Sequence, residues 1–149
     1  LVSASWIARF VATLARYDLP LYTVLTYDGR ESWVPSHPHD ADIHAAFLAH
    51  QGTAKGFGIS AGPGAGAIMG KAFAAAGYSV SAGDSPWQIG PAHAELARQL
   101  SSGIAHAALE TGRVQADAAQ AWTNFRHQHA ADAAAMALVG HVDLFAVRR

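Results

Sequence analysis

The sequence predicts an α/β protein, and two observations support this prediction. Segments with apolar residues at helical spacing alternate along the chain with short runs of β-branched and aromatic residues. The chain has 149 residues, of which 51% are hydrophobic, which is enough for the core of one ordinary domain. We therefore expect a single domain over residues 1–149, in which helices flank a sheet.

The first helix and the first strand have local boundary signals. Ser3 can cap a helix whose apolar residues share one face, and Asp18–Pro20 ends that helix. Leu21–Thr26 then forms a strand, which a turn over residues 27–30 closes. Because this run is apolar without alternation, we expect the strand to be buried on both faces, parallel and central. Residues 31–40 contain two prolines and two histidines and predict a loop.

The remaining chain continues the alternation. Pro63 and Pro91 each stand at the start of a predicted helix, while Gly77 and Gly112 stand at the ends. The predicted elements are a helix over residues 40–50, a helix over 63–77, a strand over 78–82, a helix over 91–112, a helix from about 114 and a strand over 141–147.

Composition excludes several classes of function. Ten basic and eleven acidic residues give a net charge of −1, which predicts no nucleic-acid partner. The chain has no cysteine, so disulfides and thiolate chemistry are excluded. No apolar run approaches the length of about 18 residues that spans a bilayer, so we predict no membrane partner.

The chain begins inside an apolar pattern, at Leu1 instead of Met, and without the basic start of a signal peptide. Only three strands are visible, and a sheet of three doubly covered strands is poorly sealed by itself. We therefore expect a fragment of a larger domain. Its first strand should leave an exposed edge, which self-association could cover.

A glycine-rich segment, Gly62–Gly66, stands before a helix, a strand and Asp84, which is the outline of a dinucleotide-binding turn. That turn must follow a buried strand, and the preceding residues 55–59 form a poor one. The usual spacing also places Ala61 and Pro63 where glycines are needed. The alternative interpretation is a flexible loop that leads into a helix started by proline.

Histidines two residues apart, His37 and His39, stand beside Asp40 and resemble part of a metal-binding pattern. The later positions of that pattern hold Ala41 and Asp42, which do not match it. We predict no metal, and a polar loop in which Asp40 or Asp42 caps the next helix.

Candidate site residues follow from the rule that ligands bind beyond the carboxyl ends of parallel strands. For the first strand these residues are Tyr27, Asp28 and Arg30, with Trp33 close behind. Asp28 could accept a proton or a hydrogen bond, and Arg30 could hold a carboxylate or phosphate. His50, on the inward face of its helix, is a further substrate-binding candidate.

Five short segments in this order resemble the C-terminal half of a bacterial class I S-adenosylmethionine-dependent methyltransferase. They are Leu21–Arg30, His50–Gln51 with Lys55–Gly58, Gly62–Pro63, Asp84–Trp87 and Val139–Leu144. The resemblance implies a Rossmann-like sheet of which this chain holds strands five to seven. The seventh is antiparallel and is inserted between the other two.

The resemblance also implies a cofactor and a reaction. The methyl group of S-adenosylmethionine would pass to a small-molecule acceptor beside Tyr27, Asp28 and Arg30. The glycine-rich cofactor motif belongs to the N-terminal half, so only Ser3 would border the cofactor. We therefore expect the 149-residue chain alone to be inactive and to bind the cofactor weakly.

Two alternatives remain from the sequence. One is an NAD(P)-type dinucleotide-binding module that uses Gly62–Gly66, and the other is a non-catalytic α/β interaction domain. We expect a cytoplasmic location, because cells make the cofactor there.

Overall fold

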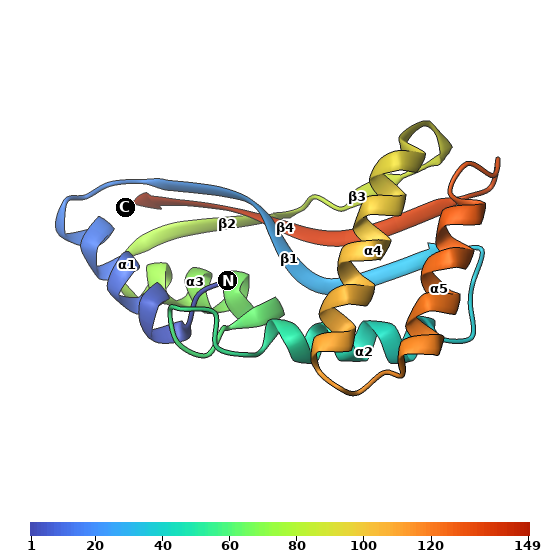
Figure 1. The fold of residues 1–149 in the computed structure, drawn as a ribbon. Helices are drawn as coiled ribbons and strands as arrows, with labels where there is room; N and C mark the ends of the chain where they lie inside the picture. The colour runs from blue at the N-terminus through green and yellow to red at the C-terminus, as the bar shows by residue number, and fades with distance from the viewer. The chain divides into compact units, whose positions relative to one another are not determined.

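A computed structural model describes all 149 residues and contains five α-helices and four strands (Figure 1). The helices are α1 (Ala4–Arg16), α2 (Asp40–Gln51), α3 (Ala65–Ala75), α4 (Ala94–Glu110) and α5 (Ala116–His129). The strands are β1 (Leu21–Val34), β2 (Tyr78–Asp84), β3 (Trp87–Ile89) and β4 (Met136–Arg148). Short 3-10 helices, Gly62–Gly64 and Pro91–His93, precede α3 and α4. The predicted α/β class is therefore confirmed.

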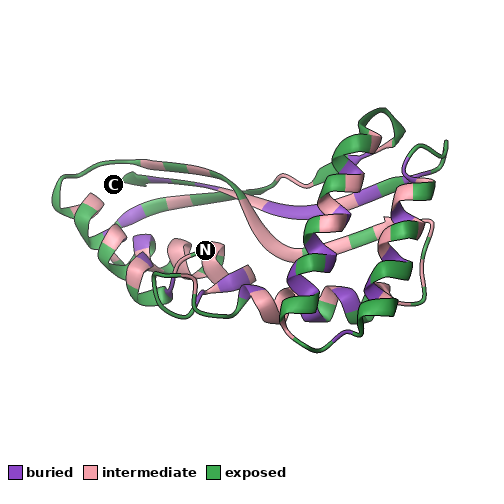
Figure 2. Cartoon of the chain, viewed as in Figure 1, coloured by how far each residue is buried: buried purple, intermediate pink, exposed green.

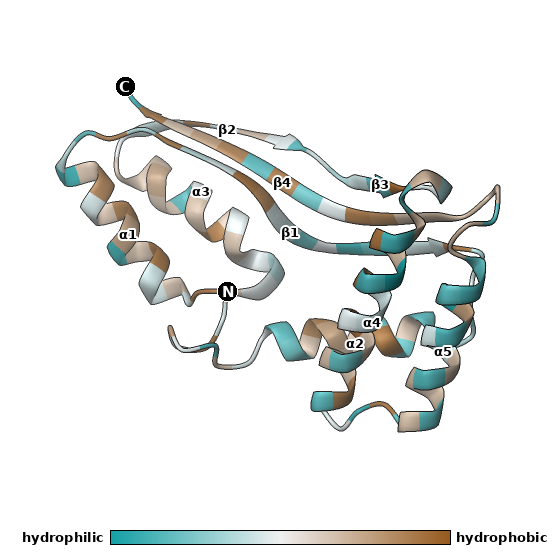
Figure 3. Cartoon of the chain, turned by 45° about the horizontal axis from the view of Figure 1, so that its top comes forward, coloured by the Kyte–Doolittle hydropathy of each residue, from teal (hydrophilic) through white to brown (hydrophobic).

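The strands form one antiparallel sheet in the order β1-β4-β2, with the short β3 also paired to β4. The register of β2 runs from Tyr78 opposite Arg148 to Asp84 opposite Val142. The last strand thus lies between the first and second predicted strands, and Figure 3 shows many hydrophobic residues along it. The three-strand prediction missed β3, because its three residues are too few to form a pattern.

The prediction for the first strand was wrong in position and length. Strand β1 is an edge strand of fourteen residues that pairs with β4. Its exposed residues include Tyr22 and Leu25, whose exposed fractions are 66% and 52%, so it is not buried on both faces (Figure 2). The strand also continues through the predicted turn, and within it Gly29 adopts a φ of 91°, which glycine tolerates. An apolar run of β-branched residues is common to edge and central strands, so it could not distinguish them.

The chain divides into two compact units, which we describe separately. The first unit comprises residues 1–30, 51–86 and 140–149, and the second comprises residues 31–50 and 87–139. Strands β1 and β4 contribute residues to both units.

The core of the first unit lies where α1 and α3 pack against β2 and β4. Its buried members are Ile7, Val11, Phe73, Tyr78, Leu144 and Ala146. The Ser3 hydroxyl accepts a hydrogen bond from the backbone N–H of Trp6 and caps α1, as predicted. The Tyr78 hydroxyl donates to the carbonyl oxygen of Leu19 over 3.0 Å, which links β2 to the segment after α1.

The core of the second unit surrounds Trp122 on α5, which is fully buried among residues of α2 and α4. Arg126, one turn later, is also buried and lies over the rings of Trp33 and Trp122. Its guanidinium pairs with Asp40 and donates to the carbonyl oxygen of Pro35. A buried arginine needs these partners, because an unpaired charge in the core is strongly unfavourable.

Candidate functional site

A pocket of about 350 Å³ lies in the first unit, where α3 faces the sheet. Such a volume falls within the range of about 300–1,000 Å³ that is typical of small-molecule sites. The lining is mostly apolar and comprises Thr26, Tyr27, Asp28, Pro63, Gly66, Ala67, Gly70, Val80, Ala82, Val142 and Leu144. The pocket therefore contains two of the predicted substrate-binding residues, Tyr27 and Asp28.

The pocket exists because α3 carries very small residues along part of its length. The residues of α3 that line the pocket are Gly66, Ala67 and Gly70. Phe73, near the other end of the helix, is fully buried in the core. A Cβ atom on Gly70 would lie 3.3 Å from Cδ1 of Leu144, so glycine permits the close approach of helix and strand there.

The alternation of exposed and less exposed residues in β1 breaks at Leu25, and we call this break the bulge of β1. Side chains of a regular strand alternate, so residues 22, 24, 26 and 28 would share one face. Tyr22 and Val24 are instead exposed, while Thr26 and Asp28 line the pocket. The shift occurs at Leu25, whose φ of 58° places it in the left-handed region, which is unusual for leucine.

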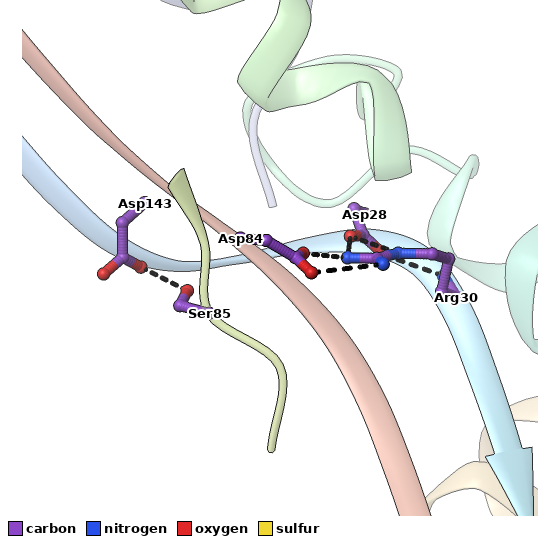
Figure 4. A network of polar contacts seen from close by, with 5 residues as sticks. All are labelled: Asp28, Arg30, Asp84, Ser85 and Asp143. Carbon is purple, nitrogen blue, oxygen red and sulfur yellow. Dashed lines mark hydrogen bonds and ion pairs between the residues drawn. The ribbon is translucent and has the colours of Figure 1, made fainter. Parts of the chain in front are cut away.

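Asp143 on β4 holds this bulge in place. Its Oδ1 accepts the backbone N–H of Leu25 over 3.2 Å. The same oxygen accepts the hydroxyl of Ser85 over 2.7 Å (Figure 4). Its Oδ2 accepts the hydroxyl of Tyr22 over 3.3 Å. The hydrogen bond from Ser85 is the main cause that lowers the pKa of Asp143, so this carboxylate stays charged.

Arg30 is bound by two carboxylates. Its guanidinium donates to Oδ2 of Asp28 from Nε over 2.8 Å and from Nη2 over 2.5 Å, and it pairs with Asp84 from β2 (Figure 4). These hydrogen bonds, first that of Asp28 and then that of Asp84, raise the pKa of Arg30. Burial raises the pKa of Asp28, but the hydrogen bonds and charge of Arg30 outweigh it and lower the pKa below its ordinary value.

Gly140 on β4 provides the space in which Asp28 lies. A Cβ atom at this position would overlap Oδ1 of Asp28 and would approach Cβ of Arg30 to 2.8 Å. Only glycine allows the Asp28 carboxylate this close to the neighbouring strand.

The other two predicted substrate-binding residues belong to the second unit. Trp33 lines a separate pocket of about 310 Å³ with Glu31, Asp40 and His44, and its Nε1 donates to Oε1 of Glu31 over 2.7 Å. His50 lies near the end of α2, where its Nε2 is 2.7 Å from Oε2 of Glu110 on α4. The site prediction therefore names residues of both units, and their role in substrate binding stays a prediction.

Ser3, the residue predicted to border the cofactor, is a helix cap. It is buried, its hydroxyl accepts the N–H of Trp6 and lies 3.0 Å from that of Ser5, and its backbone bridges to Ser60. The hydroxyl of Ser3 therefore takes part in local contacts of α1, and its place at the border of S-adenosylmethionine stays a prediction.

The glycine-rich segment forms the 3-10 helix Gly62–Gly64 that leads into α3. The residues before it make two isolated bridges, Ser3 with Ser60 and Ala54 with Ile59, and are not a strand of the sheet. A dinucleotide-binding turn needs a buried strand at that place, so this geometry does not favour the dinucleotide alternative.

The histidine-rich loop is tied to the start of α2. Oδ2 of Asp40 accepts the backbone N–H of His37 over 2.8 Å, and its Oδ1 accepts Nε1 of Trp122 over 2.7 Å. Asp40 and Asp42 lie in the first turn of α2, near the helix start as the sequence suggested, but Asp40 binds His37 and Trp122 and not the N–H groups of the helix. No group of three or more histidine or carboxylate side chains is placed to hold a metal ion.

No protein-family model matches the chain, and no curated protein matches it. None of its helices combines the length and the apolar character that crossing a membrane requires.

Three residues of the polar network beside this pocket, Asp84, Gly140 and Asp143, were not among the predicted site residues. All three lie in the segments that carry the family resemblance, which was the available signal. Their roles could not be inferred, because Asp143 contacts Leu25 across 118 positions of sequence.

Proposed function

We propose that this chain forms the acceptor side of an S-adenosylmethionine-dependent methyltransferase domain. The observation that supports the proposal most is the strand order β1-β4-β2, with the last strand antiparallel between the other two. The resemblance implies this order for strands five, seven and six, and the order of the segments along the chain does not dictate it.

A pocket beside Tyr27 and Asp28 also supports the proposal. Methyl transfer from a sulfonium requires that the acceptor be held in line with the methyl group, and positioning supplies most of the rate enhancement. A largely apolar pocket with one carboxylate can hold and orient a small acceptor without a covalent protein nucleophile. We propose a cytoplasmic location for this role, because the cofactor is made in the cytoplasm.

The sequence encoded immediately upstream of Leu1 tests the proposal. We expect a strand followed by an acidic residue and a GxGxG turn, the segment that would bind the nucleoside. An upstream sequence without such a motif would contradict the proposal.

A further inference from the structure

The pocket between α3 and the sheet is too large to be a packing defect. Protein interiors are filled so that few voids exceed one water molecule, and this pocket has a volume of about 350 Å³. Ala67 and Ala82 are exposed where they line it, so the pocket opens to solvent. Apolar walls of this extent lose free energy in water and favour a ligand that covers them.

The charges beside the pocket disfavour an anionic ligand. Arg30 is the cation of this network, and both Asp28 and Asp84 already pair with it. One arginine against two carboxylates leaves a net negative charge, which would repel a phosphate or carboxylate group. The sequence-based suggestion that Arg30 binds such a group is therefore not favoured by this geometry.

Asp28 can still accept a hydrogen bond at the edge of the pocket. A carboxylate has about four acceptor positions. Arg30 occupies three of them, through its backbone N–H to Oδ1 and through Nε and Nη2 to Oδ2. The remaining position is on Oδ1, so a ligand group that binds there must carry an N–H or O–H.

We infer that this pocket binds an uncharged, largely apolar small molecule that carries an N–H or O–H group toward Asp28. The binding chemistry follows from the pocket alone. The assignment of that molecule as the methyl acceptor rests on the proposed function.

Two related dyes test the expected preference for an uncharged ligand. N-phenyl-naphthylamine is uncharged, has one N–H group and fluoresces in apolar surroundings, while anilinonaphthalene sulfonate has the same ring system with an added anionic group. Titration of the 149-residue chain should give a Kd for the uncharged dye that is at least about tenfold lower than for the sulfonate.

Two variants that fill the pocket and one control variant test whether the dye binds in this pocket. Ala67→Leu on α3 and Ala82→Leu on β2 add side-chain volume to the pocket walls, and each should weaken binding of the uncharged dye about tenfold or more. Ala74→Leu adds the same volume at an exposed position of α3 outside the pocket and should leave the Kd unchanged. Circular dichroism checks that each variant keeps its helices.

Comparable affinity for the two dyes, or unchanged binding in both folded filling variants, would overturn the inference. Dye binding is measured without cofactor and without methyl transfer. A negative result here therefore leaves the methyltransferase proposal standing, and an upstream sequence without the nucleoside motif leaves the dye result standing.

Discussion

Asp28 and Glu31 are carboxylates three positions apart on β1, and their surroundings shift the two pKa values in opposite directions. Arg30 outweighs the effect of burial and lowers the pKa of Asp28. Burial is the main cause that raises the pKa of Glu31, and the hydrogen bond from Trp33 only partly offsets it. One oxygen of Glu31, Oε2, is buried without a hydrogen-bond partner. Ionisation of Glu31 in the folded second unit therefore lowers the stability of the protein.

Replacing Glu31 by glutamine should stabilise the protein more as the pH rises. The folded-state pKa of Glu31 is above the ordinary value of 4.5, so its contribution to stability is present below that value. This contribution is lost as the pH rises through the raised pKa, whereas glutamine does not titrate. Urea unfolding of Glu31→Gln between pH 4 and 8 measures the difference from wild type.

The control is Glu95→Gln on α4, whose carboxylate has an exposed side-chain fraction of 71%. Its free energy of unfolding should differ little from wild type across the same pH range. If the stability difference between Glu31→Gln and wild type stays constant from pH 4 to 8, burial does not raise the pKa of Glu31.

Substitution of Gly140 by alanine should destabilise the first unit. The added Cβ would overlap Oδ1 of Asp28, so either the carboxylate or the strand must move. We expect a loss of about 1–3 kcal/mol in the free energy of unfolding, which is typical of overpacking. Gly83→Ala on β2 is a matched control, since a Cβ there meets nothing within 4 Å. Equal stability of the two variants would contradict the close approach of Asp28 to β4.

At the scale of elements, the bulge in β1 determines which residues face the pocket. Replacing Asp143 by alanine removes the acceptor of the Leu25 N–H. Loss of a hydrogen bond to a charged group costs about 1.5 kcal/mol, which corresponds to roughly tenfold faster amide exchange. We expect this increase at Leu25, measured by hydrogen exchange with NMR detection, together with weaker binding of the uncharged dye.

The Ser85→Ala variant distinguishes loss of the hydrogen bond to Leu25 from other changes at the Asp143 carboxylate. It removes one donor to Asp143 and leaves the Leu25 bond in place, so exchange at Leu25 should change much less. Similar exchange at Leu25 in wild type and in the Asp143→Ala variant would show that another contact holds the bulge.

The helices were predictable because their signals are local. Ser3 caps α1, and Gly77 and Gly112, with φ of 85° and 67°, follow the ends of α3 and α4. Strand β1 was not predictable to the same degree, because the sequence does not say which strand pairs with its edges. Arg126 also escaped notice, since its burial depends on Asp40, which lies 86 positions away.

Two of the predicted site residues line the pocket, but the structural reason for their position differs from the one predicted. Tyr27 and Asp28 were chosen as the end of a parallel strand, and both line the pocket. They lie in the middle of a long edge strand, and the bulge at Leu25 turns Asp28 toward α3. Such a bulge depends on contacts between distant segments and has no signature in the sequence around Leu25.

At the scale of the whole molecule, the unpaired edge of β1 should promote self-association. Edge strands with exposed apolar residues readily pair with other chains, and Val24 has an exposed fraction of 47%. We expect light scattering to show dimers or larger species. A lysine at Val24 should shift them toward monomer, while Leu96→Lys on the exposed side of α4 should not. A monodisperse monomer of the wild-type chain would contradict this expectation.

The proposed methyltransferase would have its acceptor side in this chain and its nucleoside site in other residues. The most direct measurement is a calorimetric titration of S-adenosylmethionine into two proteins: the 149-residue chain, and the same chain extended by its upstream-encoded residues. We predict micromolar binding by the extended protein and binding at least about 100-fold weaker by the chain alone. Equal affinity in the two proteins, or no binding by the extended one, would contradict the claim.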